Sequence, residues 1–235
     1  MARALFIAAF FFTMTPLLIS LQWLLGKLNL LGWGFIASNY YRALCSLLRI
    51  RVRVNGEPVR RRAVLFVFNH VSWADILVIG SIASVAFVAK REVADWPLVG
   101  ITAKAQRTVF VDRARRHQTG DAVGEIVKRI ENGASVALFA EGTSSDGNRV
   151  LPFRSALLGA VEEAAGRGSV DSILIQPMSI CYTGQHGPQG HDQTTGRYGA
   201  PPFRGRSARA AAGCRAADSG GIYFWRRTRP ILKWL

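Results

Sequence analysis

The pattern of hydrophobic and polar residues divides the chain into three zones. The first zone opens with an uncharged run from Ala4 to Gly26, and its 23 residues exceed the roughly 20 that a helix needs to cross a bilayer. Pro16 lies inside this run and would kink a helix or divide it into two short limbs. The run is therefore compatible with a helix that spans the membrane and with a hairpin that enters and leaves the same face of the membrane. Residues 28–50 stay apolar, with aromatic residues ahead of arginines, which suits either an interfacial helix or a helix packed on the core.

The second zone, residues 51–183, alternates between two patterns. Continuous apolar runs of about four to eight residues are typical of buried strands. Between them, apolar residues recur about every three to four positions, which is roughly one helical turn and indicates helices. The expected strands cover residues 63–69, 85–90, 108–113, 135–141 and 173–180, and the expected helices cover 72–82, 95–106, 119–133 and 154–165. This alternation predicts an α/β fold with a largely parallel sheet flanked by helices, preceded by a membrane-anchoring helical segment at residues 1–50.

The third zone, residues 184–235, lacks this alternation. Gly, Pro, Arg and Ala dominate it, and no strand-like apolar run occurs before Ile222–Trp225. We interpret it as a basic Gly/Pro/Arg-rich tail that is disordered, since it has too little apolar surface to form a core. An aberrant tail, translated out of frame from a GC-rich gene, is the second interpretation.

The charge distribution indicates an anionic partner. The net charge is +15, and the tail alone carries nine basic and two acidic residues. Nucleic acid, a membrane surface and phosphorylated substrates all fit such a charge. A nucleic-acid binder would interleave stacking aromatics with the basic patch, and the tail has few aromatics, among them Phe203 and the cluster Tyr223–Trp225. We therefore expect an anionic membrane as partner and no nucleic acid. Basic residues are denser after the first apolar run than before it, which places the bulk of the chain in the cytoplasm.

The cysteines do not indicate a structural site. There are three, at Cys45, Cys181 and Cys214, and no two of them form a CxxC pair. Neither a zinc site nor a disulfide framework is expected from this count and spacing, so we predict three unpaired thiols and no metal.

The segment NHVSWAD carries the first candidate chemistry. His70 follows directly on the strand expected at 63–69, and Asp75 lies five residues later. On one ideal helix these side chains would point about 140° apart, so they meet only if His70 lies in a turn and Asp75 in the helix after it. A carboxylate there would hold one imidazole tautomer and stabilise the protonated ring, which is what a general base requires.

Two further segments follow expected strands. In FAEGTSSDG, Glu141 suits a hydroxyl or a cation, Gly142 lets a ligand approach the backbone, and Thr143 offers a hydroxyl. In VFVDRARR, Arg113 suits a phosphate, which arginine binds in bidentate fashion. The alternatives are an ordinary polar turn for the first segment and a solvated basic face for the second.

These segments, in this order, resemble those of the glycerolipid acyltransferases, a family that includes 1-acylglycerol-3-phosphate acyltransferases and lyso-ornithine-lipid acyltransferases. The resemblance covers roughly residues 25–183. Four blocks carry it: Asn69, His70 and Asp75 match N-H-x4-D; Phe110 to Arg113 match an apolar strand ending in arginine; Phe139, Glu141, Gly142 and Thr143 match F-P-E-G-T-R-S; and the strand with Pro177 matches the last block.

The chain departs from the family pattern in the third block and in the tail. Ala140 stands where the family has proline, and Ser144 stands where it has arginine. Without that arginine, Arg113 would have to supply more of the binding energy for a substrate phosphate. An acceptor lipid that has no phosphomonoester group is therefore also compatible with the sequence. Residues 184–235 do not resemble the family's continuation.

The resemblance implies an O-acyltransferase that moves a fatty acyl group from acyl-carrier protein or acyl-CoA to the free hydroxyl of a lysophospholipid. It implies 1-acylglycerol-3-phosphate as acceptor first, lyso-ornithine lipid or another lysolipid as the alternative, and an inactive membrane scaffold as a second alternative. His70 and Asp75 would be catalytic. Asn69, Arg113, Glu141, Gly142 and Thr143 would bind substrate. No cofactor beyond the thioester co-substrate is expected, and the enzyme would lie at the inner membrane facing the cytoplasm.

Overall fold

The computed structural model describes most of the first 145 residues and parts of the remainder. The described residues are 2–28, 34–59, 63–112, 117–145, 151–153, 159, 161, 173–182, 221–224 and 229–230. The chain divides into two compact units: Met1–Arg51 with Ile76–Ala122 form the first, and Val52–Asp75 with Val123–Leu235 form the second.

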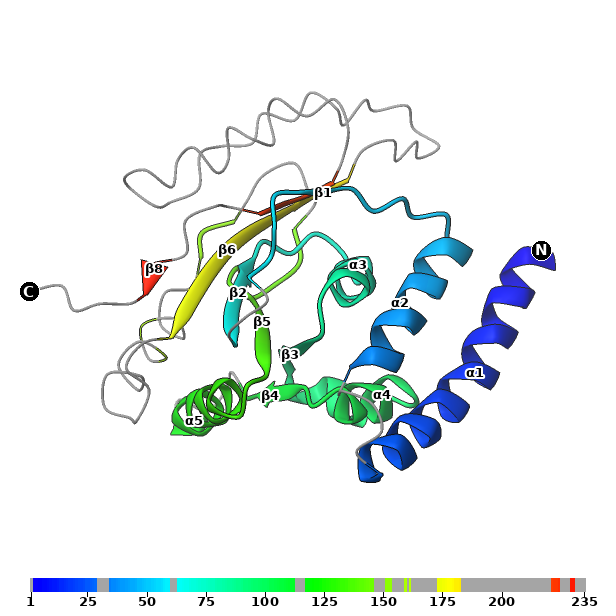
Figure 1. Ribbon diagram of the computed structural model, residues 1–235, viewed down its shortest axis with the longest axis horizontal. Coiled ribbons are helices and arrows are strands. Elements are labelled where there is room, and N and C mark those ends of the chain that lie inside the picture. Colours follow the sequence, from blue (N-terminus) through cyan, green and yellow to red (C-terminus); the bar gives the residue numbers. More distant parts are fainter. Residues whose placement is uncertain are drawn as a thin grey trace, which may run out of the picture. The chain divides into compact units, whose positions relative to one another are not determined.

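The second unit is built on a parallel sheet whose central strand is β2 (Val64–Phe68). β2 pairs in parallel with β5 (Ser135–Phe139) on one side and with β6 (Leu174–Cys181) on the other (Figure 1). The register sets Leu65 beside Val136 and Val64 beside Leu174. Every residue of β2 is buried, because the strand is covered on both faces and flanked on both edges, and this explains its unbroken apolar sequence.

Two short strands from the tail complete the sheet of the second unit. β7 (Gly221–Phe224) runs antiparallel to β6 and parallel to β1 (Val54–Asn55), and β8 (Arg229–Pro230) runs antiparallel to β6. The apolar run noted at the end of the tail thus supplies a strand. Most of residues 184–235 lie outside the described residues, as does most of the helix expected at 154–165, so both expectations stay predictions.

The first unit contains the parallel strands β3 (Val85–Lys90) and β4 (Val109–Val111). The helix expected at 95–106 between them is confirmed but is shorter: α4 covers Val99–Ala105, and a short 3-10 helix, η1 (Arg91–Asp95), precedes it. The residues Trp96-Pro97 separate the two, because a proline has no backbone N–H to donate and holds the residue before it in an extended conformation.

Two further helices match the periodicity closely. α3 (Ala74–Ile82) starts at the end of a second-unit segment and continues into the first unit, and α5 (His117–Glu131) runs from the first unit into the second.

The long helix α1 (Ala2–Lys27) continues past Pro16, so of the two alternatives left open by the sequence the structure has the single helix and not two short limbs. Its stretch Leu5–Leu25 is, among the described residues, the one helical segment long and apolar enough to cross a membrane. Large apolar side chains along it are exposed, including Phe12 and Trp23 at 60% and 63%. A helix that is apolar on all sides and uncovered needs an apolar environment.

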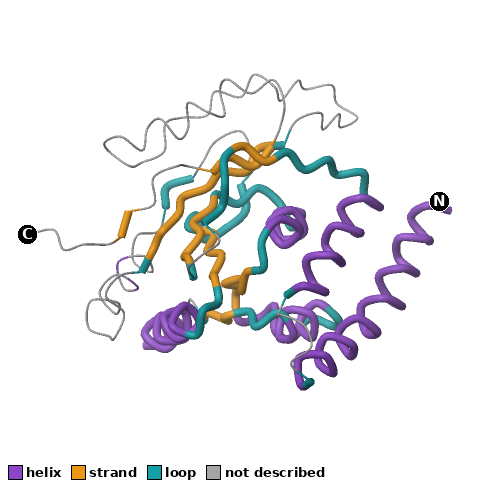
Figure 2. The backbone as a smooth tube through the Cα atoms, in the orientation of Figure 1, coloured by secondary structure: helices purple, strands orange, loops and turns teal. Residues whose placement is uncertain are grey.

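α2 (Phe35–Leu47) lies beside α1 within the first unit (Figures 1 and 2). The Tyr40 hydroxyl shares a hydrogen bond with Thr15 of α1, and the ring of Tyr41 packs over Gly80 of α3. Both tyrosines are buried, so for this face of α2 the packed-helix alternative is correct.

The cysteines differ from expectation at one position. Cys45 is a buried free thiol, as predicted, but Cys181 is disulfide-bonded, so the prediction of three unpaired thiols is wrong. The spacing of cysteines along a sequence does not show which of them lie close together in the fold.

The contact between Gly80 and Tyr41 gives a test of the first unit. A Cβ atom at Gly80 would lie 2.2 Å from the Tyr41 ring, which is buried and has little room to move. We expect Gly80→Ala to lower the unfolding free energy by about 1–3 kcal/mol, the usual range for overpacking. Gly124→Ala in α5 is the matched control, since nothing lies within 4 Å of the added atom, and it should be neutral or stabilising. Thermal unfolding of both variants checks this, and equal melting temperatures would contradict the packing.

Candidate active site

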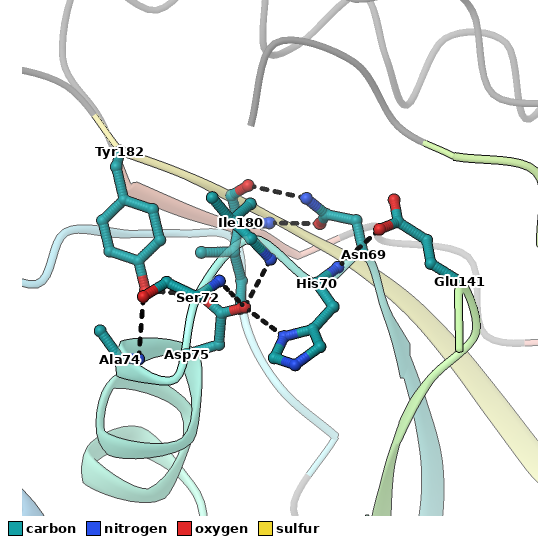
Figure 3. A network of polar contacts seen from close by, with 9 residues as sticks. Asn69, His70, Ser72, Ala74, Asp75, Glu141, Ile180 and Tyr182 are labelled. Atoms are coloured by element: carbon teal, nitrogen blue, oxygen red, sulfur yellow. Dashed lines mark hydrogen bonds and ion pairs between the residues drawn. The ribbon is translucent and has the colours of Figure 1, made fainter. Parts of the chain in front are cut away.

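His70 and Asp75 meet in the turn between β2 and α3. β2 ends at Phe68, His70 lies in the connecting loop, and Asp75 is the second residue of α3. The Nδ1 atom of His70 lies 2.7 Å from Oδ2 of Asp75 (Figure 3). The predicted arrangement, with the histidine in the turn and the carboxylate in the helix, is confirmed.

The Asp75 carboxylate is fully buried and accepts hydrogen bonds on both oxygens. Besides His70, Oδ2 accepts the backbone N–H groups of Val71 at 2.7 Å and Ser72 at 3.0 Å. Oδ1 accepts the hydroxyl of Tyr182 at 2.6 Å. The hydroxyl oxygen of Ser72 accepts the N–H of Ala74, so the first turn of α3 is capped by the same residue whose N–H binds Asp75. A group that accepts four donors in a buried place acts as an anion would.

The arrangement determines what His70 can do. Because a carboxylate only accepts, Nδ1 carries the proton of the shared hydrogen bond, and in the neutral ring the other nitrogen, Nε2, presents a lone pair. The ring stacks on Phe139 with centroids 4.1 Å apart. About a fifth of the side chain (21%) remains exposed, which leaves the imidazole accessible from one side. This is the state of a general base before it takes a proton.

Glu141 ties the loop after β5 to the His70 turn. The residue is 2% exposed, Oε2 accepts the His70 N–H at 3.2 Å, and Oε1 accepts the Leu151 N–H at 2.9 Å. Burial raises the pKa of Glu141, and the two backbone hydrogen bonds oppose that shift. A second link joins the same segments, since Ser145 donates its N–H to the His70 carbonyl at 2.8 Å. The two family blocks therefore form one structural site.

Asn69 uses its amide within the sheet. Its Nδ2 donates to the Ile180 carbonyl at 3.0 Å, and its Oδ1 accepts the Ile180 N–H at 2.8 Å. The pairing of β2 with β6 thereby extends past the end of β2, next to His70 (Figure 3). Asn69 was expected to bind substrate; both polar groups of its buried side chain are occupied by the backbone, and a substrate contact stays a prediction.

The remaining predicted residues are placed in part. Gly142 has φ +75°, a conformation that favours glycine, and donates its N–H to the Phe139 carbonyl. Thr143 and Ser144 follow it and are exposed. Arg113 lies outside the described residues, so the structure does not show where it points. Within the described ranges, no cluster of three or more His, Cys, Asp or Glu suited to a metal ion is present.

Two contributors were missed in the sequence. Phe139 was matched to the third block, but its role as the surface on which His70 stacks was not predicted. Tyr182 was not considered at all, although it follows directly on the last strand of the parallel sheet. Carboxyl ends of neighbouring parallel strands share one edge, and that is the signal that could have placed Tyr182 near His70.

Comparison with known proteins identifies the family. A family model described as "Acyltransferase" matches residues 51–181, more than half of the chain. The chain belongs to the acyltransferase family. The predicted membership is thus confirmed, and the matched region contains Asn69, His70, Asp75 and Glu141.

The relatives of this chain include lyso-ornithine lipid O-acyltransferases and 1-acyl-sn-glycerol-3-phosphate acyltransferases. The chain is 44% identical to a lyso-ornithine lipid O-acyltransferase of Rhizobium meliloti, over 71% of this chain and 56% of that protein. It is also 44% identical to a lyso-ornithine lipid O-acyltransferase of Brucella abortus, over 78% of this chain and 67% of that protein. A 1-acyl-sn-glycerol-3-phosphate acyltransferase of Neisseria meningitidis is 31% identical over 54% of this chain and 50% of that protein. The matched part spans little more than half of the Rhizobium protein's length.

A solved structure shows the same fold. The crystal structure of the 1-acyl-sn-glycerophosphate acyltransferase of Thermotoga maritima matches with a TM-score of 0.62 at 21% identity, over 97% of this chain and 86% of that one. The predicted α/β class with a mostly parallel sheet flanked by helices is confirmed.

The link that Glu141 makes between the His70 turn and the loop after β5 can be tested by measuring the unfolding free energy. Glu141→Gln replaces one accepting oxygen by an NH₂ group, so one backbone N–H loses its partner, and we expect a loss of about 1–3 kcal/mol in unfolding free energy. Because the folded-state pKa of Glu141 is raised, ionisation weakens the native fold as pH rises from the unfolded to the folded pKa. Glutamine cannot ionise, so the variant does not lose this stability. The difference in unfolding free energy between the native protein and Glu141→Gln should therefore narrow as pH rises through that interval.

Denaturant unfolding between acid and neutral pH measures this gap, with Glu131→Gln on the exposed end of α5 as the matched control. A Glu141→Gln protein as stable as the control would show that the carboxylate does not hold the two loops together.

Proposed function

We propose that this acyltransferase moves a fatty acyl group from an acyl thioester to the free hydroxyl of a lysolipid, with His70 as the general base. The observation that carries the proposal is the 2.7 Å contact between His70 Nδ1 and the buried Asp75 carboxylate, which leaves Nε2 to accept a proton.

The proposed reaction needs no acyl-enzyme intermediate. Nε2 of His70 takes the proton of the lysolipid hydroxyl as that oxygen attacks the thioester carbonyl carbon. The C–S bond then breaks, and the leaving thiolate receives the proton from the imidazolium. Asp75 stabilises the imidazolium while it exists, and the fixed Nδ1 contact keeps Nε2 turned toward the acceptor. The products are the acylated lipid and the free thiol of the donor.

We favour lyso-ornithine lipid as the acceptor, although the sequence had suggested 1-acylglycerol-3-phosphate first. Two relatives at 44% identity are named for lyso-ornithine lipid, whereas the Neisseria meningitidis relative named for 1-acylglycerol-3-phosphate is at 31%. Ser144 agrees with this choice, because it stands where the family pattern has an arginine suited to a phosphate. 1-Acylglycerol-3-phosphate, with Arg113 at its phosphate, is the second candidate.

The donor is an acyl-carrier protein or coenzyme A thioester, and no further cofactor is part of the proposal. We assign Gly142 and Thr143 to acceptor binding, because they lie in the loop that Glu141 and Ser145 join to the His70 turn. The role of Glu141 is to hold this loop beside the His70 turn, because its buried carboxylate accepts backbone hydrogen bonds from both segments.

The protein would act at the inner membrane, with its catalytic residues on the cytoplasmic side. The uncovered apolar length of α1 supports insertion into the bilayer, and the positive charges that follow it favour the cytoplasmic leaflet. A lysolipid acceptor resides in the same membrane, so the anchor would bring the enzyme to its substrate.

The acceptor is tested by offering purified full-length protein both lysolipids, each with acyl-carrier protein and coenzyme A thioesters, and by identifying the products by mass spectrometry. We expect lyso-ornithine lipid to be acylated faster. Preferential formation of phosphatidic acid would replace the favoured acceptor by the second candidate, and no transfer with any pair would support the inactive scaffold.

His70→Ala should lower turnover by roughly 10²–10⁴-fold, the range associated with loss of a general base. The melting temperature should stay near that of the native protein, because part of the ring is exposed and its hydrogen bond is one of four on Asp75. Glu131→Gln at the exposed end of α5 is the control and should keep its activity. Native rates in His70→Ala would exclude the proposed mechanism.

Membrane attachment through α1 should resist salt. Burial of apolar side chains is not screened by ions, whereas attraction of basic residues to anionic lipids is. We expect full-length protein to sediment with anionic vesicles both in dilute buffer and after a wash at molar salt. Release of the protein by that wash would show that charge alone holds it and that α1 does not insert.

A further inference from the structure

Tyr182 reaches the catalytic carboxylate from the opposite side to His70. Its hydroxyl donates to Oδ1 of Asp75 at 2.6 Å, while His70 and two backbone N–H groups occupy Oδ2 (Figure 3). Each oxygen of the carboxylate thus has its own set of donors. The two sets come from distant parts of the sequence, since Tyr182 lies 107 residues from Asp75.

The position of Tyr182 is fixed by the strand before it. β6 ends at Cys181, and the backbone of Ile180 is held on one edge by the amide of Asn69 and on the other by pairing with Ile222 of β7. Tyr182 follows directly on this strand end, which is hydrogen-bonded on both edges, so its backbone has little freedom to move. A hydroxyl attached to a rigid backbone can hold its acceptor in one orientation.

The hydrogen bond from Tyr182 has two physical effects on Asp75. It opposes rotation of the carboxylate about its last torsion, which keeps Oδ2 turned toward Nδ1 of His70. It also draws negative charge toward Oδ1, because a charge-assisted hydrogen bond polarises its acceptor. Less negative charge then faces the imidazole, and the protonated ring is stabilised less.

We propose that Tyr182 is a positioning residue that orients the Asp75 carboxylate and sets how readily His70 accepts a proton. This inference rests on the proposed role of His70 as the general base. Tyr182 itself need not touch substrate, because its effect reaches the reaction through Asp75.

Tyr182→Phe removes the hydroxyl and keeps the ring. We expect kcat to fall roughly 10- to 100-fold, less than the roughly 10⁴-fold loss when the carboxylate that directly orients a catalytic histidine is removed, because Tyr182 acts one hydrogen bond further away, with little change in KM for either substrate. The acid limb of the pH–rate profile should move to higher pH, because more negative charge on Oδ2 keeps the imidazole protonated further up the scale. A variant with 3-fluorotyrosine at 182 donates more strongly and should move that limb to lower pH.

Tyr40→Phe is the matched control. It also removes a tyrosine hydroxyl that hydrogen-bonds a neighbouring side chain, but Tyr40 belongs to the first unit, whereas Asp75 belongs to the second, and its hydroxyl bonds Thr15. Its stability loss should resemble that of Tyr182→Phe, while its kcat and pH profile should match the native protein. A mutational cycle with Asp75→Asn adds a second check, because Tyr182→Phe should cost far less once the carboxylate is gone.

A readout independent of acyl transfer separates this inference from the proposed function. The proton shared between Nδ1 of His70 and Asp75 gives a proton NMR signal far downfield of ordinary amide signals, and His70→Ala assigns it. Tyr182→Phe should shift that signal, and Tyr40→Phe should leave it in place. An unmoved signal together with an unmoved pH profile would overturn the role of Tyr182. A shifted signal in a protein without acyl transfer would sustain that role and refute the proposed function instead.

Discussion

A buried negative charge organises this protein's candidate site. Removing an ionised carboxylate from water is strongly unfavourable unless hydrogen bonds replace those that water made. Asp75 meets that condition with four donors, and they come from the turn after β2 and from the residue after β6. Satisfying the charge therefore requires the turn and the strand end to take one particular arrangement, and His70 is among the groups so arranged.

The site rests on backbone groups more than on side-chain packing. Glu141 and Asn69 both belong to family blocks, and both bind the backbone of a segment far away in sequence. Their side chains join β2, the loop after β5 and the end of β6 around His70. Family membership explains the presence of these residues, and their contacts give a structural reason why an amide and a carboxylate occupy those positions.

The sequence was sufficient for features that depend on neighbouring residues. Apolar runs located β2, β5 and β6 to within two residues at either end, and the five-residue spacing of His70 and Asp75 defined a strand–turn–helix geometry that the structure confirms. It was insufficient where the contact is distant, as for Tyr182, because periodicity reports which face a residue occupies and not which strand end lies beside it. The helix expected at 95–106 starts later than expected, at Val99, for a local reason, since the effect of Pro97 was overlooked.

The order of strands in the sheet has a consequence for how the protein is made. β2 is completed early in the chain, but its partner on one side is β6, and Asn69 must wait for Ile180, 111 positions later. Pairing across such a separation raises contact order and slows folding. At a synthesis rate of about 5–20 residues per second, β2 spends several seconds on the ribosome with the backbone N–H and C=O groups of one edge unpaired. The nascent chain thus passes through a period of exposure to aggregation in which chaperone binding would be an advantage.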